Sequence, residues 1–330
     1  MIYTLSDFDY TLPKELIAQQ PANPRDHSRL LVYDRKTGTI TDDYFYNLYR
    51  YLPSASTLVV NNSKVEKSRL LFGGKEVFIT DQHNNHTVDA LVRPGKKFRL
   101  GDNVKLTSEI TARVKDVLDD GRRRLLFNIS LDDARFEAHR LTPFPPYIEQ
   151  NEDLADRYQT IFARHQGSKA APTAGLHFTD EVFKNLAEKG ISRAEVTLHV
   201  GLGTFAPVKN EKLENSLHSE LYEIDRQTAM QLNDTSHITA VGTTSARVLE
   251  SNRLINNRFT PGKKSTDIYI KPGFEFKAVD ALVTNFHLPK STLLIMIASL
   301  MGYEQMRVVY RHAIAEKYRF YSFGDAMLIL

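Results

Sequence analysis

The sequence predicts an α/β main domain, built on a mixed, largely parallel sheet or a partial barrel with helices, and a small antiparallel β-barrel domain inserted into it. From residue 146 onward, apolar strand segments alternate with helical patterns, as they do in parallel α/β sheets. Between residues 67 and 145, short segments of partly alternating polarity are separated by turn signals, which is typical of a small barrel. The main domain is therefore predicted to hold residues 1–66 and 146–330, and the inserted domain residues 67–145.

The first segment of the main domain is predicted to contain a short helix over residues 12–20, a hairpin that turns at 35–39, and a buried strand over 57–62. The buried strand ends in two amides, Asn61 and Asn62. Polar residues at the carboxyl end of a buried strand are where α/β folds place ligands. Asparagine also favours turns, so a purely structural interpretation remains equally open.

The inserted segment, residues 67–145, carries the excess of positive charge. It has 15 Lys and Arg against 11 Asp and Glu, whereas the whole chain has a net charge of only +3. This excess is compatible with a polyanion such as RNA, and also with an ordinary solvated basic face. Three arginines, Arg122, Arg123 and Arg124, are predicted at a hairpin tip, where a nucleic-acid contact and a solvated turn are the alternatives.

The second segment of the main domain is predicted to alternate strands and helices up to an apolar C-terminus that is tied into the core. The predicted strands cover 195–200, 238–242, 280–286 and a last segment near 319–323, and the predicted helices cover 179–190, 243–250, 292–300 and 303–318.

The composition excludes several classes of function. With no cysteine, the chain cannot form disulfides, a catalytic thiolate or a Cys-ligated zinc or iron–sulfur site. The N-terminus has no basic region followed by an apolar one, and no apolar run approaches membrane-spanning length. We therefore expect a cytoplasmic protein with no membrane partner.

Residues 170–178 form the stretch around which the chain is organised. It is almost free of charge and contains two groups that can do chemistry, Thr173 and His177. A helix pattern follows at once, from the good N-cap Thr179 to a stop at Gly190. Such a loop offers free backbone N–H groups and a titratable imidazole, although a tight structural turn with a satisfied histidine has the same pattern.

Three histidines, His177, His199 and His287, each lie beside small or polar residues near a strand–helix transition. Catalytic groups of α/β proteins collect at such strand ends. If the three converge in one cleft, they form an acid/base or polar binding site; a core histidine is the alternative for any one of them. The sequence has no short His-x-x-x-His or His-Glu-x-x-His spacing, so no metal site is predicted.

A glycine-rich turn, Gly201-Leu-Gly203-Thr204, follows a predicted strand and imitates a dinucleotide-binding fingerprint. Glu223 lies about twenty residues further on, as that fingerprint requires, but Pro207 stands where its helix should open. A nicotinamide-dependent oxidoreductase is therefore a minor alternative, and the glycines are better explained by close backbone approach to another ligand.

Another strand-to-helix turn carries Thr243 and Thr244, with Arg247 and Glu250 one turn further on. Its hydroxyls, N–H groups and charge pair suit a carboxylate or a ribose. An N-cap cluster with an intrahelical ion pair is the competing interpretation.

Several long motifs together resemble a known family. They are Ala171-Pro-Thr-Ala-Gly-Leu-His-Phe178, Val196-Thr-Leu-His-Val-Gly-Leu-Gly-Thr-Phe205, His218-Ser-Glu220, Ala240-Val-Gly-Thr-Thr-Ser245, Thr284-Asn-Phe-His-Leu-Pro-Lys-Ser-Thr-Leu293 and Tyr321-Ser-Phe-Gly-Asp-Ala-Met-Leu328. In this order they cover nearly the whole chain, and the chain resembles the S-adenosylmethionine:tRNA ribosyltransferase-isomerase family of queuosine biosynthesis.

The resemblance implies an α/β domain with an inserted β-barrel, and a transferase–isomerase reaction. The ribosyl group of S-adenosylmethionine would be transferred and isomerised onto 7-aminomethyl-7-deazaguanine (preQ1) at the wobble position of tRNA. The products would be epoxyqueuosine-tRNA, adenine and methionine. S-adenosylmethionine is then a consumed substrate, no cofactor is expected, tRNA is the partner, and a monomer is expected.

The chain departs from the family pattern after the strand that ends at Val60. Members usually have Asn-Asp-Thr-Arg there, whereas this chain has Asn61, Asn62, Ser63 and Lys64. An acid is replaced by an amide and an arginine by a lysine, which is not equivalent at a bidentate site. A non-catalytic RNA-binding paralogue is therefore the alternative function.

The implied chemistry needs a base for the ribose C5′ proton beside the sulfonium, and polar groups that hold the ribose. We expect His177 to be that base, poised near neutrality, with His199 and His287 as positioning groups, because its loop is charge-poor and precedes a helix N-terminus. The expected substrate-binding residues are Asn61, Thr173, Gly175, Phe178, Gly201, Gly203, Thr204, Thr243, Thr244, Arg247, Glu250, Asn285, Lys290 and Ser291.

Overall fold

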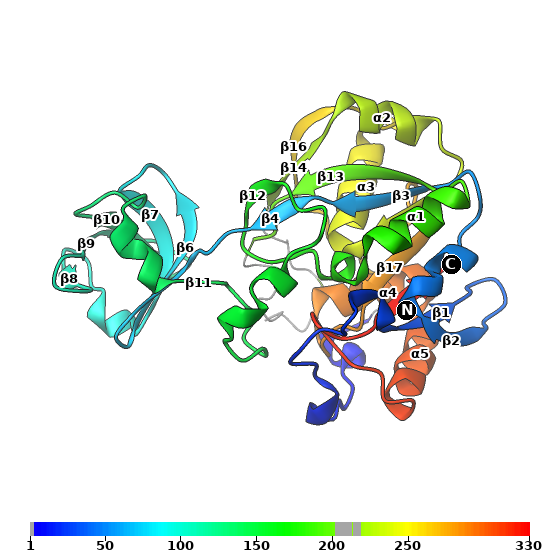
Figure 1. Cartoon of the computed structure of the whole chain (residues 1–330), viewed down its shortest axis with the longest axis horizontal. Coiled ribbons are helices and arrows are strands. Elements are labelled where there is room, and N and C mark those ends of the chain that lie inside the picture. Colours follow the sequence, from blue (N-terminus) through cyan, green and yellow to red (C-terminus); the bar gives the residue numbers. More distant parts are fainter. Residues whose placement is uncertain (1–2, 202–212, 214–218) are drawn as a thin grey trace. The chain divides into compact units, whose positions relative to one another are not determined.

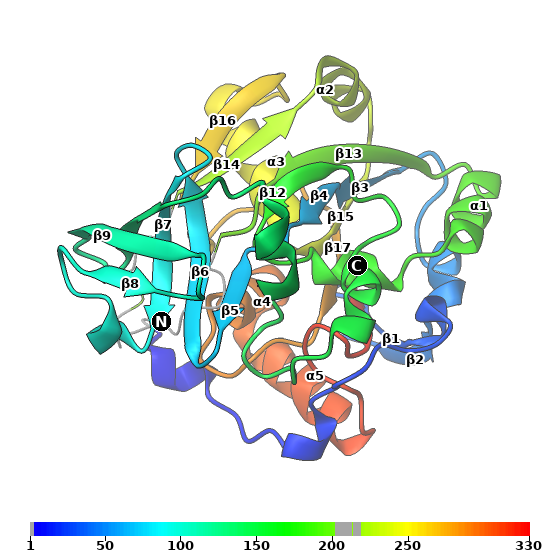
Figure 2. The ribbon, with the colours of Figure 1, turned by 60° about the vertical axis from the view of Figure 1, so that its left-hand side comes forward.

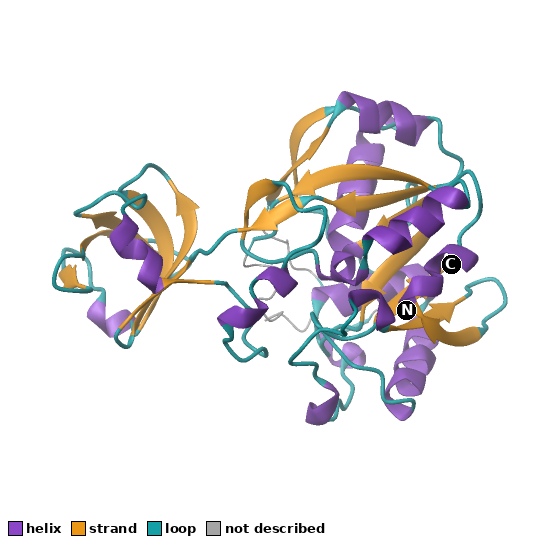
Figure 3. Cartoon of the chain, in the orientation of Figure 1, coloured by secondary structure: helices purple, strands orange, loops and turns teal. Residues whose placement is uncertain are grey.

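The structure, a computed structural model, describes residues 3–201, 213 and 219–330, and it divides the chain into two compact units (Figure 1). The first unit comprises residues 1–64 and 145–330, and the second comprises residues 65–144. Both boundaries lie within two residues of those expected from the sequence. The α-helices of the described residues all belong to the first unit, while the second unit consists mainly of strands and loops (Figure 3).

A mixed sheet forms the centre of the first unit. Its nine strands, in spatial order, are β16 (Gly262–Thr266), β14 (Glu220–Ile224), β13 (Ser192–Leu198), β3 (Thr57–Asn61), β15 (Ile238–Val241), β17 (Ala281–Asn285), β18 (Ala326–Ile329), β1 (Arg29–Tyr33) and β2 (Ile40–Tyr44). The four central strands β13, β3, β15 and β17 run parallel. The remaining neighbours pair antiparallel, except β18 with β1. The predicted mixed sheet is confirmed, but only half of its strand pairings are parallel, so it is not the largely parallel sheet that was expected.

The central strands are buried on both faces because apolar side chains alternate between two cores. Along β3, Val59 faces one core while Leu58 and Val60 face the other. The first core is covered by helices α2 (Arg226–Asn233), α3 (Gly242–Asn256), α4 (Thr292–Met301) and α5 (Tyr303–Ala315), and the second by α1 (Asp180–Glu188). Continuous apolar strands of this kind are what a sheet between two layers requires.

Helix starts follow their capping residues. Thr179, Asp225 and Ser291 each accept a backbone N–H at the start of α1, α2 and α4. The predicted helix over 12–20 is wrong, because only a 3₁₀ turn over Lys14–Leu16 forms there. Backbone bonds between this segment and Phe320 replace the helical ones, since Ala18 donates to Phe320 and Phe320 donates to Leu16.

The predicted strand near 319–323 is also wrong, since the last strand is β18 and residues 319–325 form a tight loop. Tyr321 has a φ of +73°, and a Cβ on Gly324 would lie 2.4 Å from the carbonyl oxygen of Arg319. The Asp325 carboxylate accepts the backbone N–H groups of Arg29 and Arg319. These long-range contacts fix a loop that no local strand pattern reveals.

The second unit is an antiparallel sheet around its own apolar core. Its strands, in spatial order, are β11 (Arg140–Leu141), β5 (Arg69–Phe72), β6 (Lys75–Gln82), β7 (Thr87–Arg93), β10 (Arg123–Phe127), β9 (Thr111–Val117) and β8 (Asn103–Lys105). Figure 2 shows the sheet curling, and within the described residues its edge strands β8 and β11 are not paired with each other. A separate pair, β4 (Ser63–Val65) and β12 (His165–Ser168), lies where the chain leaves the first unit.

In the described part of the chain, no single helix is long and apolar enough to cross a membrane. Helices α4 and α5 reach the required length and composition only as a pair, and they are bent by 113° at Gly302.

Candidate active site

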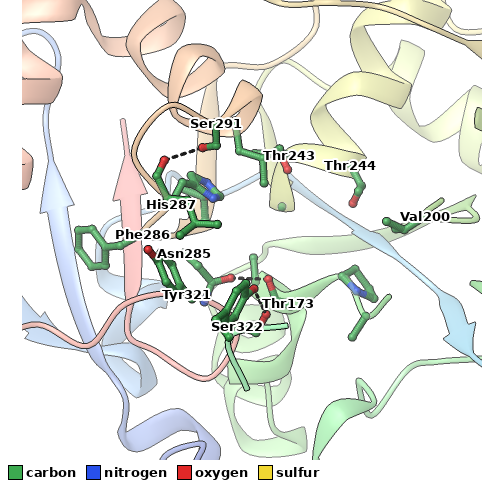
Figure 4. A pocket seen from close by; sticks show the side chains of 18 of the residues that line it. Thr173, Val200, Thr243, Thr244, Asn285, Phe286, His287, Ser291, Tyr321 and Ser322 are labelled. Atoms are coloured by element: carbon green, nitrogen blue, oxygen red, sulfur yellow. Dashed lines mark hydrogen bonds between the residues drawn. The ribbon is translucent and has the colours of Figure 1, made fainter. Parts of the chain in front are cut away.

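A cavity of about 300 Å³ lies at the carboxyl ends of the parallel strands in the first unit (Figure 4). Its walls are the segments 171–174, 242–244, 284–291 and 321–322, with Tyr147, Val200 and Leu293. Segments 242–244 and 284–291 contain the ends of β15 and β17 and the turns into α3 and α4. The carboxyl ends of adjacent parallel strands share one edge of a sheet, which is why loops so distant in sequence meet here.

Six of the fourteen predicted substrate-binding residues line this cavity: Thr173, Thr243, Thr244, Asn285, Lys290 and Ser291, with the predicted histidine His287. The others in the described chain do not line it, namely Asn61, Gly175, Phe178, Gly201, Arg247 and Glu250, with the histidines His177 and His199. Gly203 and Thr204 lie outside the described residues. The three histidines therefore do not share one cavity wall.

His287 is the histidine of the cavity wall. Its Nε2 lies 2.8 Å from the hydroxyl of Thr284, and its backbone N–H donates to the hydroxyl of Tyr310 at 3.1 Å. The hydroxyl of Tyr10 donates to its carbonyl oxygen. Burial lowers the pKa of His287 to about 3, so the imidazole is neutral at physiological pH. The other ring nitrogen, Nδ1, has no hydrogen bond with a described residue and is the ring position left for a ligand.

His177 lies behind the cavity wall and is linked to it by two hydrogen bonds. Its Nε2 is 3.1 Å from the amide nitrogen of Asn285, and Asn285 in turn accepts a 2.9 Å bond from the hydroxyl of Thr173. Because the Asn285 amide can only donate, Nε2 is the acceptor and Nδ1–H donates to the hydroxyl of Ser28 at 2.8 Å. Both ring nitrogens are therefore occupied.

The pKa values of the two buried histidines, His177 and His287, are lower than the near-neutral value expected of the general base. Burial lowers the pKa of His177 to about 4, with smaller and opposite contributions from Asp325, which raises it, and from Arg319 and Arg25, which lower it. Desolvation rather than the dipole of α1 is thus the main reason that this imidazole stays neutral. Both buried histidines can accept a proton, but each is a weaker base than free histidine.

His199 and Gly201 belong to a neighbouring part of the first unit. The ring of His199 packs on Gly167, where a Cβ would come within 3.2 Å of its Nδ1. Gly201 donates its backbone N–H to Glu220 at 3.0 Å, and the buried Arg247 donates to the same carboxylate. The expected pair between Arg247 and Glu250 is therefore wrong, because the side chain of Glu220 on β14 takes that place.

Glu250 anchors the chain before β17. It is completely buried and accepts the backbone N–H groups of Lys277, Ala278 and Val279 at 2.9, 3.0 and 2.9 Å. Burial raises the pKa of its carboxyl, and the three N–H donors oppose this by stabilising the charged form. Its role in this structure is to hold a backbone segment.

Gly175 and Phe178 pack against neighbouring side chains and do not line the cavity. A Cβ on Gly175 would lie 2.8 Å from the ring of Phe162 and 2.9 Å from the methyl group of Thr160. Phe178 is fully buried against Phe45 and Phe183. Their place in the same motif as Thr173 therefore reflects the support of the loop rather than contact with the cavity.

The departure from the family pattern lies at the β3–β13 edge and not in the cavity. Asn62 donates to Glu195 at 3.0 Å and accepts from the hydroxyl of Thr197 at 2.7 Å, while Lys64 is exposed. An aspartate at position 62 would place a second carboxylate beside Glu195, so the amide fits this neighbour. Asn61 bonds both backbone groups of Leu198 and fixes the same edge.

Two tyrosines of the cavity wall, Tyr147 and Tyr321, were not predicted from the sequence. Their ring centroids lie 4.7 Å apart, and the Tyr147 hydroxyl is 2.8 Å from that of Ser322. Burial raises the pKa of Tyr147 to about 12, so its hydroxyl stays protonated. The positive φ of Tyr321 is a structural signal of a functional loop, but nothing local in the sequence reveals it.

Among the described residues, no group of three or more His, Asp or Glu side chains could hold a metal ion. A polar pocket at the carboxyl edge of parallel strands is the usual binding site of an α/β enzyme that acts on a small molecule.

The chain belongs to the family described as queuosine biosynthesis protein, whose model matches residues 5–329. Proteins named S-adenosylmethionine:tRNA ribosyltransferase-isomerase from Thermotoga maritima, Acetivibrio thermocellus and Staphylococcus haemolyticus are 46%, 44% and 43% identical to it. These matches cover 99%, 98% and 99% of this chain and 99% of each relative. A crystal structure of an S-adenosylmethionine tRNA ribosyltransferase from Thermotoga maritima is similar at a TM-score of 0.58 and 37% identity, covering 98% of this chain and 100% of that chain. The family inferred from the motifs is confirmed.

Proposed function

We propose that this chain transfers and isomerises the ribosyl group of S-adenosylmethionine onto preQ1 at the wobble position of tRNA. The products are epoxyqueuosine-tRNA, adenine and methionine. The observation that carries the proposal is the match, over 99% of both chains, to relatives with the corresponding name. The cavity at the parallel strand ends, which has a mainly apolar wall and a few polar side chains, supplies a site of the required kind.

We assign S-adenosylmethionine to this cavity. No described side chain caps the first turn of α3, so the N–H groups of residues 242–244 remain available at the positive end of the helix dipole. They suit the methionine carboxylate. The hydroxyls of Thr173 and Thr243 suit the ribose, and the apolar wall of Leu288, Leu293 and Tyr321 suits the adenine.

His287 is the general base of the proposed mechanism. The sulfonium acidifies the ribose C5′ proton, and Nδ1 of His287 is the imidazole nitrogen available to accept it in the cavity wall. The bond between Nε2 and Thr284 orients the ring, and the proposed base is the tautomer in which Nε2–H donates to the Thr284 hydroxyl and Nδ1 is unprotonated. Adenine then leaves, and the aminomethyl group of preQ1 attacks the ribosyl carbon.

His177 acts through Asn285 in this mechanism. Its neutral Nε2 accepts the Asn285 amide, so the Asn285 carbonyl points at the hydroxyl of Thr173. A proton on Nε2 would remove this acceptor and release the asparagine. We therefore replace the earlier expectation that His177 is the base with a positioning role.

Mass spectrometry of the tRNA tests the proposal. Transcribed tRNA carrying preQ1 is incubated with the protein and S-adenosylmethionine, and we expect epoxyqueuosine together with equimolar adenine and methionine. The same tRNA with guanine at the wobble position is the matched control and should stay unchanged. Binding of the preQ1 tRNA without any conversion would overturn the proposal in favour of a non-catalytic RNA-binding paralogue.

A further inference from the structure

We infer that a second hollow of the first unit binds the RNA strand that flanks the target nucleotide, through a phosphate and a stacked base. This inference rests on the proposed function, because it takes tRNA as the substrate. The hollow has a volume of about 360 Å³ and is separate from the cavity described above. Its lining combines the cations Arg29, Lys317 and Arg319 with His27 and Tyr44.

The charge of this hollow favours an anion. The carboxylate that lines it, Asp325, is only 2% exposed and is already neutralised by Arg319, whose Nη2 lies 2.9 Å away. Arg29 has a more distant carboxylate, Asp42, at 3.9 Å. Lys317 is exposed and forms no ion pair within the described chain. Since Arg319 is already paired with Asp325, Arg29 and Lys317 are the two cations of the hollow that suit a phosphate.

The backbone at Lys317 decides which variant tests this residue best. This residue follows the last turn of α5 with a φ of +56°, in the left-handed region that favours glycine. Its N–H donates to Ile314 and the next N–H, of Tyr318, donates to Ala313, which is the helix-ending motif in which glycine is the usual residue. Glycine would adopt this φ at lower cost, so replacing Lys317 by glycine removes the ammonium group without straining the backbone.

An exposed aromatic side chain completes the pattern for single-stranded RNA. Tyr44, at the end of the edge strand β2, is 47% exposed. Its ring stacks on Tyr46, with centroids 5.5 Å apart and planes inclined by only 3°. Tyr46 supports one face of the Tyr44 ring, and the opposite face suits a base. Cations around a groove with an exposed aromatic ring at its edge are typical of single-strand binding.

The position of the hollow suits the nucleotides next to the modified one. The loop 319–325 contributes Arg319 and Asp325 to this hollow and Tyr321 and Ser322 to the cavity. Since Arg319 and Tyr321 are two residues apart, their Cα atoms lie no more than about 7 Å from each other. Both sites are therefore built on one loop, so an RNA strand held in the hollow would lie against the loop that also lines the proposed reaction site.

The test measures tRNA affinity at several salt concentrations for the wild type, Lys317→Gly and Tyr44→Ala. We expect Lys317→Gly to be at least as stable as the wild type, to bind tRNA about threefold to tenfold more weakly, and to lower the salt slope by about 0.7. Tyr44→Ala should weaken binding by roughly 5- to 150-fold, whereas Tyr44→Phe, which keeps the ring, should not. Lys184→Ala, which removes an exposed lysine on α1, is the charge control and should bind as the wild type does.

Two outcomes would overturn the inference. If Lys317→Gly and Tyr44→Ala bind tRNA with the affinity and salt slope of the wild type, the hollow is not an RNA site, while the proposed function stands. If the wild type neither binds nor converts preQ1 tRNA, the proposed function fails and this assignment fails with it.

Discussion

In the first unit, buried polar side chains gather where parallel strands end, whereas in the second unit charged side chains pair with each other along an antiparallel sheet. Asn61, Asn285 and His287 are all buried at the carboxyl ends of β3 and β17. In the second unit, Arg122 pairs with Asp81 and Asp120, and other arginines pair in the same way: Arg69 with Glu76, Arg124 with Asp89, Arg135 with Asp133, and Arg140 with Glu137.

The difference follows from sheet geometry. Parallel strands bring all their carboxyl ends to one edge, so the polar residues there come together and leave a cavity between their loops. An antiparallel sheet with one core face sends alternate side chains inward and outward, so polar groups spread over the outer face and find partners across strands. A surplus of positive charge in the sequence of the second unit is therefore no measure of how many cations are available to RNA.

His287→Ala is the strongest test of the claim that buried polar groups at the strand ends of the first unit form the reaction site. If His287 is the general base, kcat should fall by roughly a hundredfold to ten-thousandfold, because proton transfer at the reacting carbon is lost. Binding of S-adenosylmethionine, measured by calorimetry, should change far less. His177→Ala is the matched comparison and should lower kcat less, since His177 acts through Asn285. A larger loss of turnover in His177→Ala, with binding retained, would return the role of base to His177.

A second test asks whether every polar group at this edge serves the substrate. Glu250→Ala leaves three backbone N–H groups without an acceptor, at about 1–3 kcal/mol each, so the free energy of unfolding should fall by on the order of 3 kcal/mol or more. We expect a thermal midpoint lower by about 6–12 °C. Glu188→Ala, at the exposed end of α1, is the control and should change the midpoint little. Unchanged stability with a raised Kd for S-adenosylmethionine would instead place Glu250 in the binding site.

The buried histidines make a prediction about pH. The pKa of His177 is about 4 in the folded chain and about 6.5 when unfolded, so the unfolded chain binds its proton first as the pH falls. Stability from this group is therefore fully present above pH 6.5, is lost between pH 6.5 and about 4, and amounts to on the order of 3 kcal/mol. Urea unfolding at pH 7.5 and pH 5 should show a smaller difference for His177→Gln than for the wild type. The exposed His165→Gln variant should keep the wild-type difference; if His177→Gln keeps it too, His177 is not the group that titrates.

The sequence predicts the parts of this architecture that are local. The apolar runs of β3, β15 and β17 and the caps of α1 and α4 follow from residue type and spacing, and so does the convergence of the loops after them. The family motifs add the fold and the reaction class.

The contacts that the sequence did not predict join residues that lie far apart in the chain. Arg247 was expected to pair with Glu250 three residues away, but the fold brings Glu220 of β14 to it. The hydroxyl that accepts the Nδ1–H of His177 belongs to Ser28, 149 residues earlier. Spacing along one helix identifies candidates for an ion pair, and only the tertiary structure decides which of them meet.

The smallest expected effect tests the claim that arginines of the second unit are already paired within the protein. We expect the triple variant Arg122→Ala, Arg123→Ala, Arg124→Ala to change tRNA affinity by no more than about twofold to threefold, with the salt slope unchanged within one unit. The reason is that none of the three guanidinium groups is free. Arg122 bonds Asp81 and Asp120, Arg123 donates to the carbonyl oxygens of Phe98 and Gly121, and Arg124 holds Asp89 through two bonds.

Thermal unfolding of the triple variant shows whether its second unit is still folded, and this must be known before a change in tRNA binding is interpreted. The buried Asp89 carboxylate loses its two bonds to Arg124, so we expect a lower thermal midpoint for the second unit of the triple variant, with the unit still folded at about 25 °C. With the unit still folded, a salt slope lower by about three would show that each arginine contacts a phosphate. The ion pairs seen here would then open on RNA binding, and the contrast between the two units would hold only for the chain without its RNA.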